Sequence, residues 1–359
     1  MVGQHGDLAC CVRCVGPTAA GRLARRAVLS AAVHPRAADP QRAAPAARPS
    51  VPPGTGSPAA SSRPLPAGPA PAAACPVLTG TVLDTSPHVV AFLDGDREQR
   101  VALSPDASIW RGRPADATFL EAGDSVVIRL LPGMRAVADR IWANAGRVTG
   151  LIVASDRDGL LVDEGRTASH QAVVIPPRAA GRLQVRFPRL EPGYLLDVIG
   201  LRHPGYLEAW VPATSQPAHR PAAAPAPGLA RTRVAASIPG SASWHEPACA
   251  AEAAGVRYPA LDPGTACLEH PLPGSPSPHL PYLSVGSLLR VRNECTGTTG
   301  GWPVSGCAAT APAFCDRCVT CGTSPRGRLA SLPMASFVAM GGDLERGCFN
   351  ATVSVGQPS

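Results

Sequence analysis

The residues of this chain with the greatest chemical potential are the cysteines near its C-terminal end. Eight of the twelve cysteines fall within the last 111 residues, in a stretch rich in Gly, Thr, Ser and Pro. An even set this dense is typical of a disulfide framework, which staples a small loop-rich domain in an oxidising compartment. We expect structural disulfides and an extracellular or cell-envelope location, with Cys295 and Cys307 as a candidate pair across a predicted hairpin. The eight cysteines are Cys249, Cys267, Cys295, Cys307, Cys315, Cys318, Cys321 and Cys348.

Part of this set has the spacing Cys-x-x-Cys-x-x-Cys, from Cys315 to Cys321. That spacing also opens an iron–sulfur run, but the fourth cysteine of that pattern is missing. A zinc site needs one more ligand, and His270 and His279 are distant in the sequence. A redox pair would favour a thioredoxin-like βαβ context, which is not found. Structural disulfides are the preferred interpretation, and we expect no metal and no cofactor.

The elements that must position these residues read as short strands and one helix. A Gly turn at Gly286 leads into a strand with apolar positions at 289 and 291, and Trp302-Pro303-Val304 is a returning strand. Residues 333–340 have Pro at the start and apolar residues at helical spacing, so they predict a short amphipathic helix that ends at Gly341-Gly342. Residues 348–355 alternate as a final strand.

This order of elements resembles the double-psi β-barrel of rare lipoprotein A-like proteins and of the first domain of expansins. The resemblance rests on Leu-x-x-Gly-x-x-Leu-x-Val-x-Asn at 283–293, on Gly-Arg-hydrophobic-x-x-Leu at 327–332, and on Glu269-His270-Pro271-Leu272. It covers roughly residues 243–356. It implies a secreted or wall-associated domain that engages peptidoglycan or another wall polysaccharide.

Members of that family with activity cleave the glycan through carboxyl groups that protonate the glycosidic oxygen. The two positions that match the family's aspartates hold Gly306 and Ser331 here. The resemblance therefore implies binding without catalysis, with Asp316 and Asp343 as weak substitutes for the missing acid. Two alternatives stay open: an endolytic transglycosylase or expansin-like loosening protein, and a structural secreted scaffold.

Aromatic side chains in this segment are the candidate glycan-binding residues. Sugar rings stack on exposed aromatic faces, while Phe337 and Phe349 fall on periodic apolar faces and are expected in the core. The candidates are Trp302, Trp244, Tyr258 and Tyr282, with His245 beside Trp244.

An internal repeat precedes this domain. Thr79-Gly80-Thr81-Val82-Leu83 recurs 70 residues later as Thr149-Gly150-Leu151-Ile152-Val153, and Leu120-Glu121-Ala122-Gly123-Asp124 recurs at the same offset as Leu190-Glu191-Pro192-Gly193-Tyr194. Short strands separated by Gly, Asp and Pro turns indicate a small OB-like barrel in each repeat. The Leu-Glu-x-Gly-Asp step resembles tandem barrels of exported bacterial proteins, and we expect a spacer or scaffold role for the pair.

Composition divides the rest of the chain. Residues 1–75 are an Arg/Pro/Ala-rich stretch expected to be disordered, with a possible export signal at 22–38. This stretch holds eight arginines against two aspartates, so most of the net charge of +7 lies there and the folded part shows no nucleic-acid-binding face. No run is long enough for a transmembrane helix. The predicted chain is mainly β: barrels at 76–146 and 147–215, a linker at 216–242 and a disulfide-rich double-psi barrel at 243–356, with the oligomeric state left open.

Overall fold

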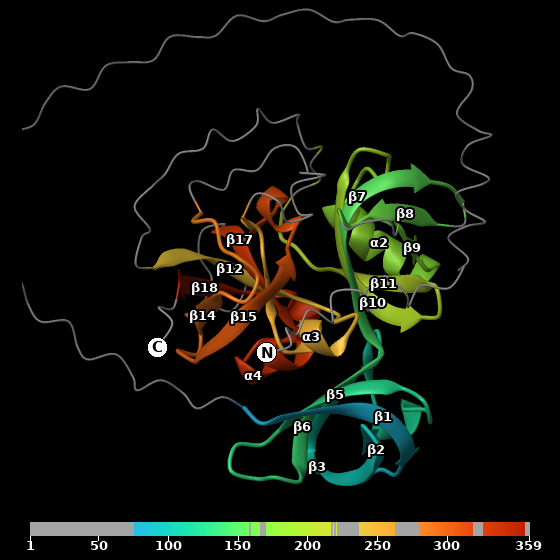
Figure 1. The fold of residues 1–359 in the computed structure, drawn as a ribbon. Helices are drawn as coiled ribbons and strands as arrows, with labels where there is room; N and C mark the ends of the chain where they lie inside the picture. The colour runs from blue at the N-terminus through green and yellow to red at the C-terminus, as the bar shows by residue number, and fades with distance from the viewer. Residues whose placement is uncertain are drawn as a thin grey trace, which may run out of the picture.

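The computed structural model describes residues 75–157, 159–165, 170–216, 218, 220, 237–262, 280–318 and 326–355. The predicted leader and export signal, most of the predicted linker, Cys267 and Cys321 lie outside these residues. The described chain is mainly β and folds into three closed small barrels (Figure 1). The predicted fold class is confirmed.

The first barrel closes because β2 pairs with both β1 and β3 at the two ends of the sheet order β2-β1-β5-β6-β3. All of its pairs are antiparallel except β3 with β6. Its core contains alternating side chains such as Val90, Phe92 and Ile128, all fully buried. Its elements are β1 (Val77–Thr85), β2 (Val89–Asp94), β3 (Arg97–Trp110), β4 (Pro114–Ala115), the 3-10 helix η2 (Ala117–Phe119), β5 (Ser125–Leu130) and β6 (Val137–Ala143).

The second barrel has the strand order β10-β11-β9-β8-β7 and closes through β10 and β7. One helix, α2, packs on it through buried Ala179 and Leu183. The first residue of α2 is Pro177, and proline is well tolerated at this position of a helix. Its elements are β7 (Ala145–Ser155), β8 (Leu160–Asp163), β9 (His170–Val174), α2 (Pro177–Arg186), β10 (Leu195–His203) and β11 (Tyr206–Pro212).

These two barrels are structural copies of each other. In the first, Val82 donates its N–H to the carbonyl of Asp124 and accepts from Gly123; in the second, Ile152 makes the same two bonds with Tyr194 and Gly193. Each partner lies 70 residues after its counterpart. The two turn glycines also share a positive φ, 94° and 91°, which only glycine adopts readily.

The third barrel has the order β12-β18-β14-β15-β13-β17, closed by the pairing of β12 with β17, and β16 adds to its edge. Two of its pairs are parallel, β12 with β17 and β13 with β15. Its elements are β12 (Ile238–His245), α3 (Ala250–Ala253), β13 (Val256–Tyr258), β14 (Leu288–Asn293), β15 (Thr299–Cys307), the 3-10 helix η4 (Ala311–Ala313), β16 (Cys315–Asp316), β17 (Arg326–Pro333), α4 (Met334–Ala339), the 3-10 helix η5 (Leu344–Arg346) and β18 (Cys348–Val355).

The third barrel begins earlier than the sequence indicated, because β12 starts at Ile238, inside the predicted linker. Residues 239–242 are small and show no apolar alternation, so they do not read as a strand. Their size has a physical reason: a side chain on Gly240 would place its Cβ 2.3 Å from Cγ of Leu329. Only glycine fits at position 240, where the side chain of Leu329 occupies the space.

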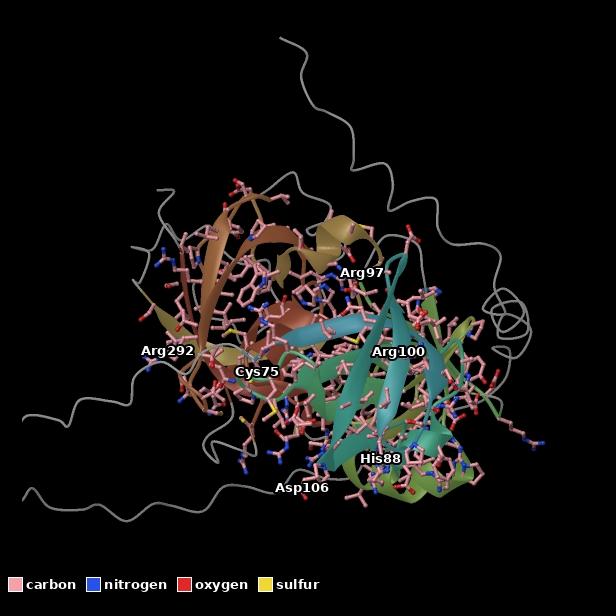
Figure 2. The ribbon with its side chains drawn as sticks, turned by 90° about the horizontal axis from the view of Figure 1, so that it is seen from below. Cys75, His88, Arg97, Arg100, Asp106 and Arg292 are labelled. Atoms are coloured by element: carbon pink, nitrogen blue, oxygen red, sulfur yellow. The ribbon has the colours of Figure 1, made fainter. Side chains whose placement is uncertain are left out.

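The three barrels share one apolar cluster. It joins Trp142 of the first barrel and Ile199 of the second to Trp244 and Phe337 of the third. Where the first barrel meets the third, the N–H of Cys75 donates to the carbonyl of Ala339 at the end of α4, 3.1 Å away. Figure 2 shows Cys75 near the third barrel and Arg100 on the strands of the first.

Candidate ligand-binding cavity

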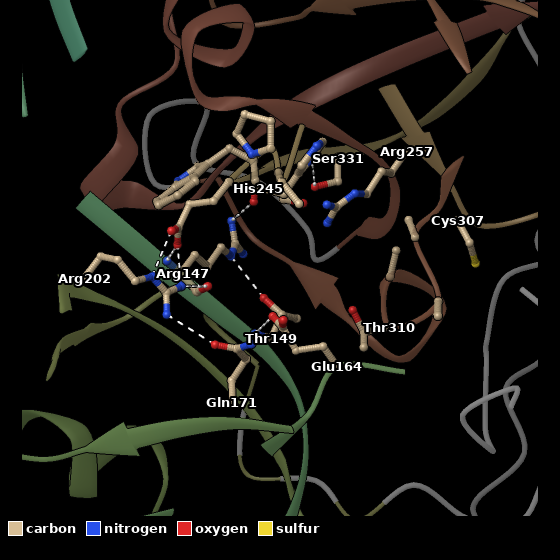
Figure 3. Close-up of a pocket in the computed structure, with 18 of the residues that line it drawn as sticks. Arg147, Thr149, Glu164, Gln171, Arg202, His245, Arg257, Cys307, Thr310 and Ser331 are labelled. Atoms are coloured by element: carbon tan, nitrogen blue, oxygen red, sulfur yellow. Dashed lines mark hydrogen bonds and ion pairs between the residues drawn. The ribbon is translucent and has the colours of Figure 1, made fainter. Parts of the chain in front are cut away.

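A polar cavity of about 310 Å³ lies between the second and third barrels (Figure 3). This volume is at the lower end for cavities that hold small ligands. Thr149, Glu164 and Gln171 face it from the second barrel, and His245, Arg257 and Ser331 face it from the third. Two barrels therefore build its walls, and their contact must be held rigidly for the cavity to persist.

A buried network of ion pairs holds this contact. Asp197 of β10 lies between two guanidinium groups: Arg147 Nη2 is 2.7 Å and Arg328 Nη2 is 2.6 Å from its Oδ2. Thr149 Oγ1 also donates to Asp197 Oδ1 at 2.8 Å. Burial alone would raise the pKa of Asp197, but the two arginine charges more than offset it and hold the pKa at about 2. Asp197 is thus an ionised link between β7, β10 and β17.

Asp316, a sequence candidate for the catalytic acid, is the second carboxylate of this network. Arg328 Nε lies 2.8 Å from its Oδ2, and Thr214 and Ser241 donate to it at 3.0 and 3.1 Å. Its side chain is fully buried. The catalytic prediction for Asp316 was wrong: a carboxylate that accepts this many bonds and faces no cavity has no route to a glycosidic oxygen. Although burial favours the neutral form of Arg328, Asp316 and Asp197 raise its pKa.

The charged pair in the second barrel replaces an apolar pair in the first. Arg147 and Asp197 lie 70 residues after Val77 and Val127. Val127 belongs to the apolar cluster that contains Phe337 of the third barrel, and Val77 packs against that cluster. Equivalent positions of the two copies thus face the third barrel, one through apolar packing and the other through buried charge.

The arginines that line the cavity all have carboxylate partners. Glu246 accepts from Arg202 Nε at 2.8 Å, from Arg202 Nη2 at 2.5 Å and from the N–H of Arg147 at 2.8 Å. Arg257 Nη2 lies 2.7 Å from Glu252. With Arg147 and Arg328 paired as above, the walls carry no excess positive charge. The cavity therefore suits an uncharged, hydroxyl-rich ligand better than an anion.

Ser331, the residue at one of the family's aspartate positions, lies on the cavity wall with two polar neighbours. Its Oγ lies 3.2 Å from Nδ1 of His245. Arg257 is its direct partner across the antiparallel β13–β17 pair, so the two side chains leave the same face of the sheet. All three residues are less than a tenth exposed.

The predicted stacking residues separate into buried and accessible ones. Tyr258 is fully buried, its hydroxyl donates to the carbonyl of Pro281, and burial raises its pKa. Trp244 is 1% exposed and donates its indole N–H to the carbonyl of Leu344 at 2.8 Å. Packing covers the ring of Tyr258, so the stacking predicted for it was wrong, whereas the largely buried Trp244 is among the residues that line the cavity. His245 does line the cavity.

Trp302, Tyr282 and Asp343 lie away from the cavity lining. Trp302 is half-buried on β15 and packs against the shared apolar cluster. Tyr282 is 40% exposed in the segment before β14. Asp343, the second candidate acid, caps η5 by accepting the N–H of Glu345 and lies 3.7 Å from Arg346. It has the role of a turn residue.

The described cysteines form only part of the expected framework. Cys295 and Cys307 are each disulfide-bonded, whereas Cys315, Cys318 and Cys348 carry free thiols. Sγ of Cys318 lies 3.6 Å from Sγ of Cys295, well beyond the S–S bond length of about 2.05 Å. The hairpin register pairs Arg292 with Thr299 and Leu288 with Pro303. Cys307 therefore lies at the opposite end of the hairpin from Cys295, and the expected bridge between them is wrong.

Several residues of the cavity were not singled out by the sequence. Gln171, Glu164, Glu246 and Arg257 occur in no short motif, since residues up to 184 positions apart, Arg147 and Ser331, meet there only after the second and third barrels have formed. One signal was present in the repeat. Where the first copy has valines at 77 and 127, the second has Arg147 and Asp197.

No family model and no curated protein matches this chain. Within the described ranges, no helix has the length and apolar character needed to span a membrane. The same ranges contain no group of three or more His, Cys, Asp or Glu side chains arranged to hold a metal ion.

Proposed function

We propose that this chain binds an uncharged, hydroxyl-rich segment of a cell-wall polysaccharide, such as peptidoglycan, in the cavity between the second and third barrels, without cleaving its glycosidic bonds. In this proposal the third barrel is a rare lipoprotein A-like double-psi barrel in an extracellular or envelope location. The first two barrels act as spacer and as one wall of the site.

The observation that carries this proposal is the character of the walls. They present amide, hydroxyl, imidazole and paired guanidinium groups, which hydrogen-bond sugar hydroxyls, and their arginine charges are already compensated. Sugar hydroxyls need such partners because burying them without hydrogen bonds is costly. The location rests on the resemblance, because the cysteines divide: Cys295 and Cys307 are each disulfide-bonded, whereas Cys315, Cys318 and Cys348 carry free thiols.

The absence of a placed proton donor supports binding over glycosidic cleavage. Gly306 and Ser331 lack carboxyl groups, and both oxygens of Glu246 accept N–H bonds. The enzyme alternative rests on one observation, that Glu164 also lines the cavity. An acid there would have to act without the paired carboxylate that glycosidases use.

The test is a pull-down of the full chain on purified peptidoglycan sacculi, with the soluble fraction analysed for released fragments. We expect retention without release. The double variant Gln171→Leu/Thr310→Val removes polar edges from both walls and should weaken binding about tenfold, equivalent to one or two hydrogen bonds. Thr310 makes no side-chain cap bond, so its replacement should not disturb η4.

The matched control is Gln99→Leu, a half-buried glutamine on the first barrel that does not line the cavity. Equal binding of the wild-type chain, the double variant and the control would contradict the cavity as the site. Trp302→Ala tests the separate β15 surface. If the wild-type chain releases soluble muropeptides and Glu164→Gln abolishes that release, the chain is a transglycosylase. If the chain shows neither binding nor release, the structural scaffold is the remaining alternative.

A further inference from the structure

We infer that Ser331, His245 and Arg257 form an acyl-transfer site that hydrolyses small esters in this cavity. Ser331 Oγ lies 3.2 Å from His245 Nδ1, about the separation across which an imidazole accepts a serine proton. Both side chains line the cavity. This activity is distinct from glycosidic cleavage, because serine acts as a nucleophile and not as an acid.

The strand pairing fixes the geometry of the three residues. Ser331 pairs with Ser243 in the parallel β12–β17 ladder, and His245 follows two residues later on the same strand, so their side chains share a face. Arg257 is directly opposite Ser331 across β13–β17. Directly opposed residues have Cβ atoms about 4.5–5.5 Å apart, which brings the guanidinium charge close to the hydroxyl.

The surroundings hold these groups in place. Arg257 is positioned by its ion pair with Glu252, at 2.7 Å. β17, which carries Ser331, is anchored three residues earlier by Arg328 and its two buried carboxylates. A nucleophile on such a rigid strand is preorganised, which is the condition for efficient acyl transfer.

The reaction balances with an ester and water alone. The Ser331 Oγ–H proton moves to His245 Nδ1 as Oγ bonds to the acyl carbon, and Arg257 stabilises the oxyanion. The carbon–alkoxy bond then breaks and the leaving alcohol takes the proton from His245. Water attacks the acyl-serine, again losing a proton to His245, and the Oγ–carbon bond breaks to release a carboxylic acid and restore Ser331. The substrate class is a short acyl ester of a sugar-sized alcohol.

The test uses a fluorophosphonate probe and 4-nitrophenyl acetate on the full chain. We expect the probe to label Ser331, located by peptide mass spectrometry on the wild-type protein, a measurement that needs no variant to fold. Ser331→Ala and His245→Gln should each lower hydrolysis about 100-fold or more, the usual contribution of a nucleophile–base pair. Ser305→Ala, in the same barrel but outside the cavity lining, should stay within about twofold of wild type.

Two results would overturn the inference: no label on Ser331, or hydrolysis by Ser331→Ala at the wild-type rate. Thermal unfolding of each variant shows whether a loss of hydrolysis is caused by misfolding. The probes contain no glycan, so a negative result here leaves sacculus binding untouched, and absence of sacculus binding leaves this activity standing.

Discussion

Arg328 of the third barrel and Asp197 of the second lie 2.6 Å apart, and both side chains are almost completely removed from solvent. Arg147 and Asp316 extend this contact into an alternating chain of two arginines and two aspartates. Each charge is compensated, and hydroxyls of Thr149, Thr214 and Ser241 satisfy further oxygens. This arrangement, together with the shared apolar cluster and the Arg202–Glu246 pair, holds the two barrels in the relative position that shapes the cavity.

Removing the charge of Asp197 should destabilise the protein strongly. Asp197→Asn leaves Arg147 and Arg328 without their shared carboxylate in a site that water does not reach, so we expect a loss of about 3–5 kcal/mol in the free energy of unfolding. Urea unfolding measures it. The control is Glu208→Gln, which breaks the pair with the 60%-exposed Arg178 and should cost about 1 kcal/mol or less. Similar costs for the two variants would contradict the structural role of Asp197.

Acid should weaken this protein through the same carboxylate. The folded pKa of Asp197, about 2, lies below its usual value of 3.8, so its contribution to stability is fully present above pH 3.8. That contribution is lost as the pH falls from 3.8 towards about 2. The difference in unfolding free energy between wild type and Asp197→Asn, measured by urea titration from pH 7 to pH 2, should shrink across this window. A difference that stays constant would show that Asp197 keeps an ordinary pKa.

The glycine at the start of each repeat should tolerate no side chain. A Cβ on Gly150 would lie 2.0 Å from the carbonyl oxygen of Asp163, and a Cβ on Gly80 would lie 2.0 Å from that of Leu93. Gly150→Ala and Gly80→Ala should therefore each cost at least about 2 kcal/mol by forcing paired strands apart. The control, Gly181→Ala, lies in α2 with open space around its Cα and should stabilise by about 0.5–1 kcal/mol. Thermal unfolding measures all three, and a neutral Gly150→Ala would contradict the close strand approach.

The thiols of the third barrel should react according to their burial. Cys318 and Cys348 are buried, and burial raises the pKa of the Cys348 thiol, so alkylation without reductant should modify these two only after unfolding. The half-buried Cys75 should react in the native protein. Peptide mapping by mass spectrometry distinguishes the sites. Peptides joined through Cys315, Cys318 or Cys348 would instead restore the disulfide framework that the cysteine density predicts.

The repeat and the strands were predictable because their causes are local. Gly80 and Gly150 are required by close strand contacts, Gly123 and Gly193 by a positive φ, and each leaves a mark in the sequence at a fixed offset. The helix after Pro333 and its end at Gly341 follow from the same local rules.

The cavity was not predictable because its causes are distant in the sequence. The sequence offered Asp316 as a weak candidate for the catalytic acid, and only the approach of Arg328 and Ser241 shows that it is a buried anchor. Trp244 and Tyr258 were predicted to be ligand-binding aromatics. Their burial could not be predicted, because the sequence does not show which aromatic rings become covered when the barrels pack together. Cysteine density suggested cross-links, but the register of β14 and β15 separates the favoured pair.

The third barrel contacts the first barrel through a valine pair and the second barrel through an arginine–aspartate pair. These two contacts differ in their sensitivity to pH. Contacts through Val77 and Val127 involve no ionisable group, but the same joint also carries ion pairs of Arg140 with Asp343 and Glu345 of the third barrel. The attachment through Arg147 and Asp197 responds to protonation. Protonation of Asp197 at about pH 2 removes the shared carboxylate of the second joint, so strong acid should loosen the contact that shapes the cavity.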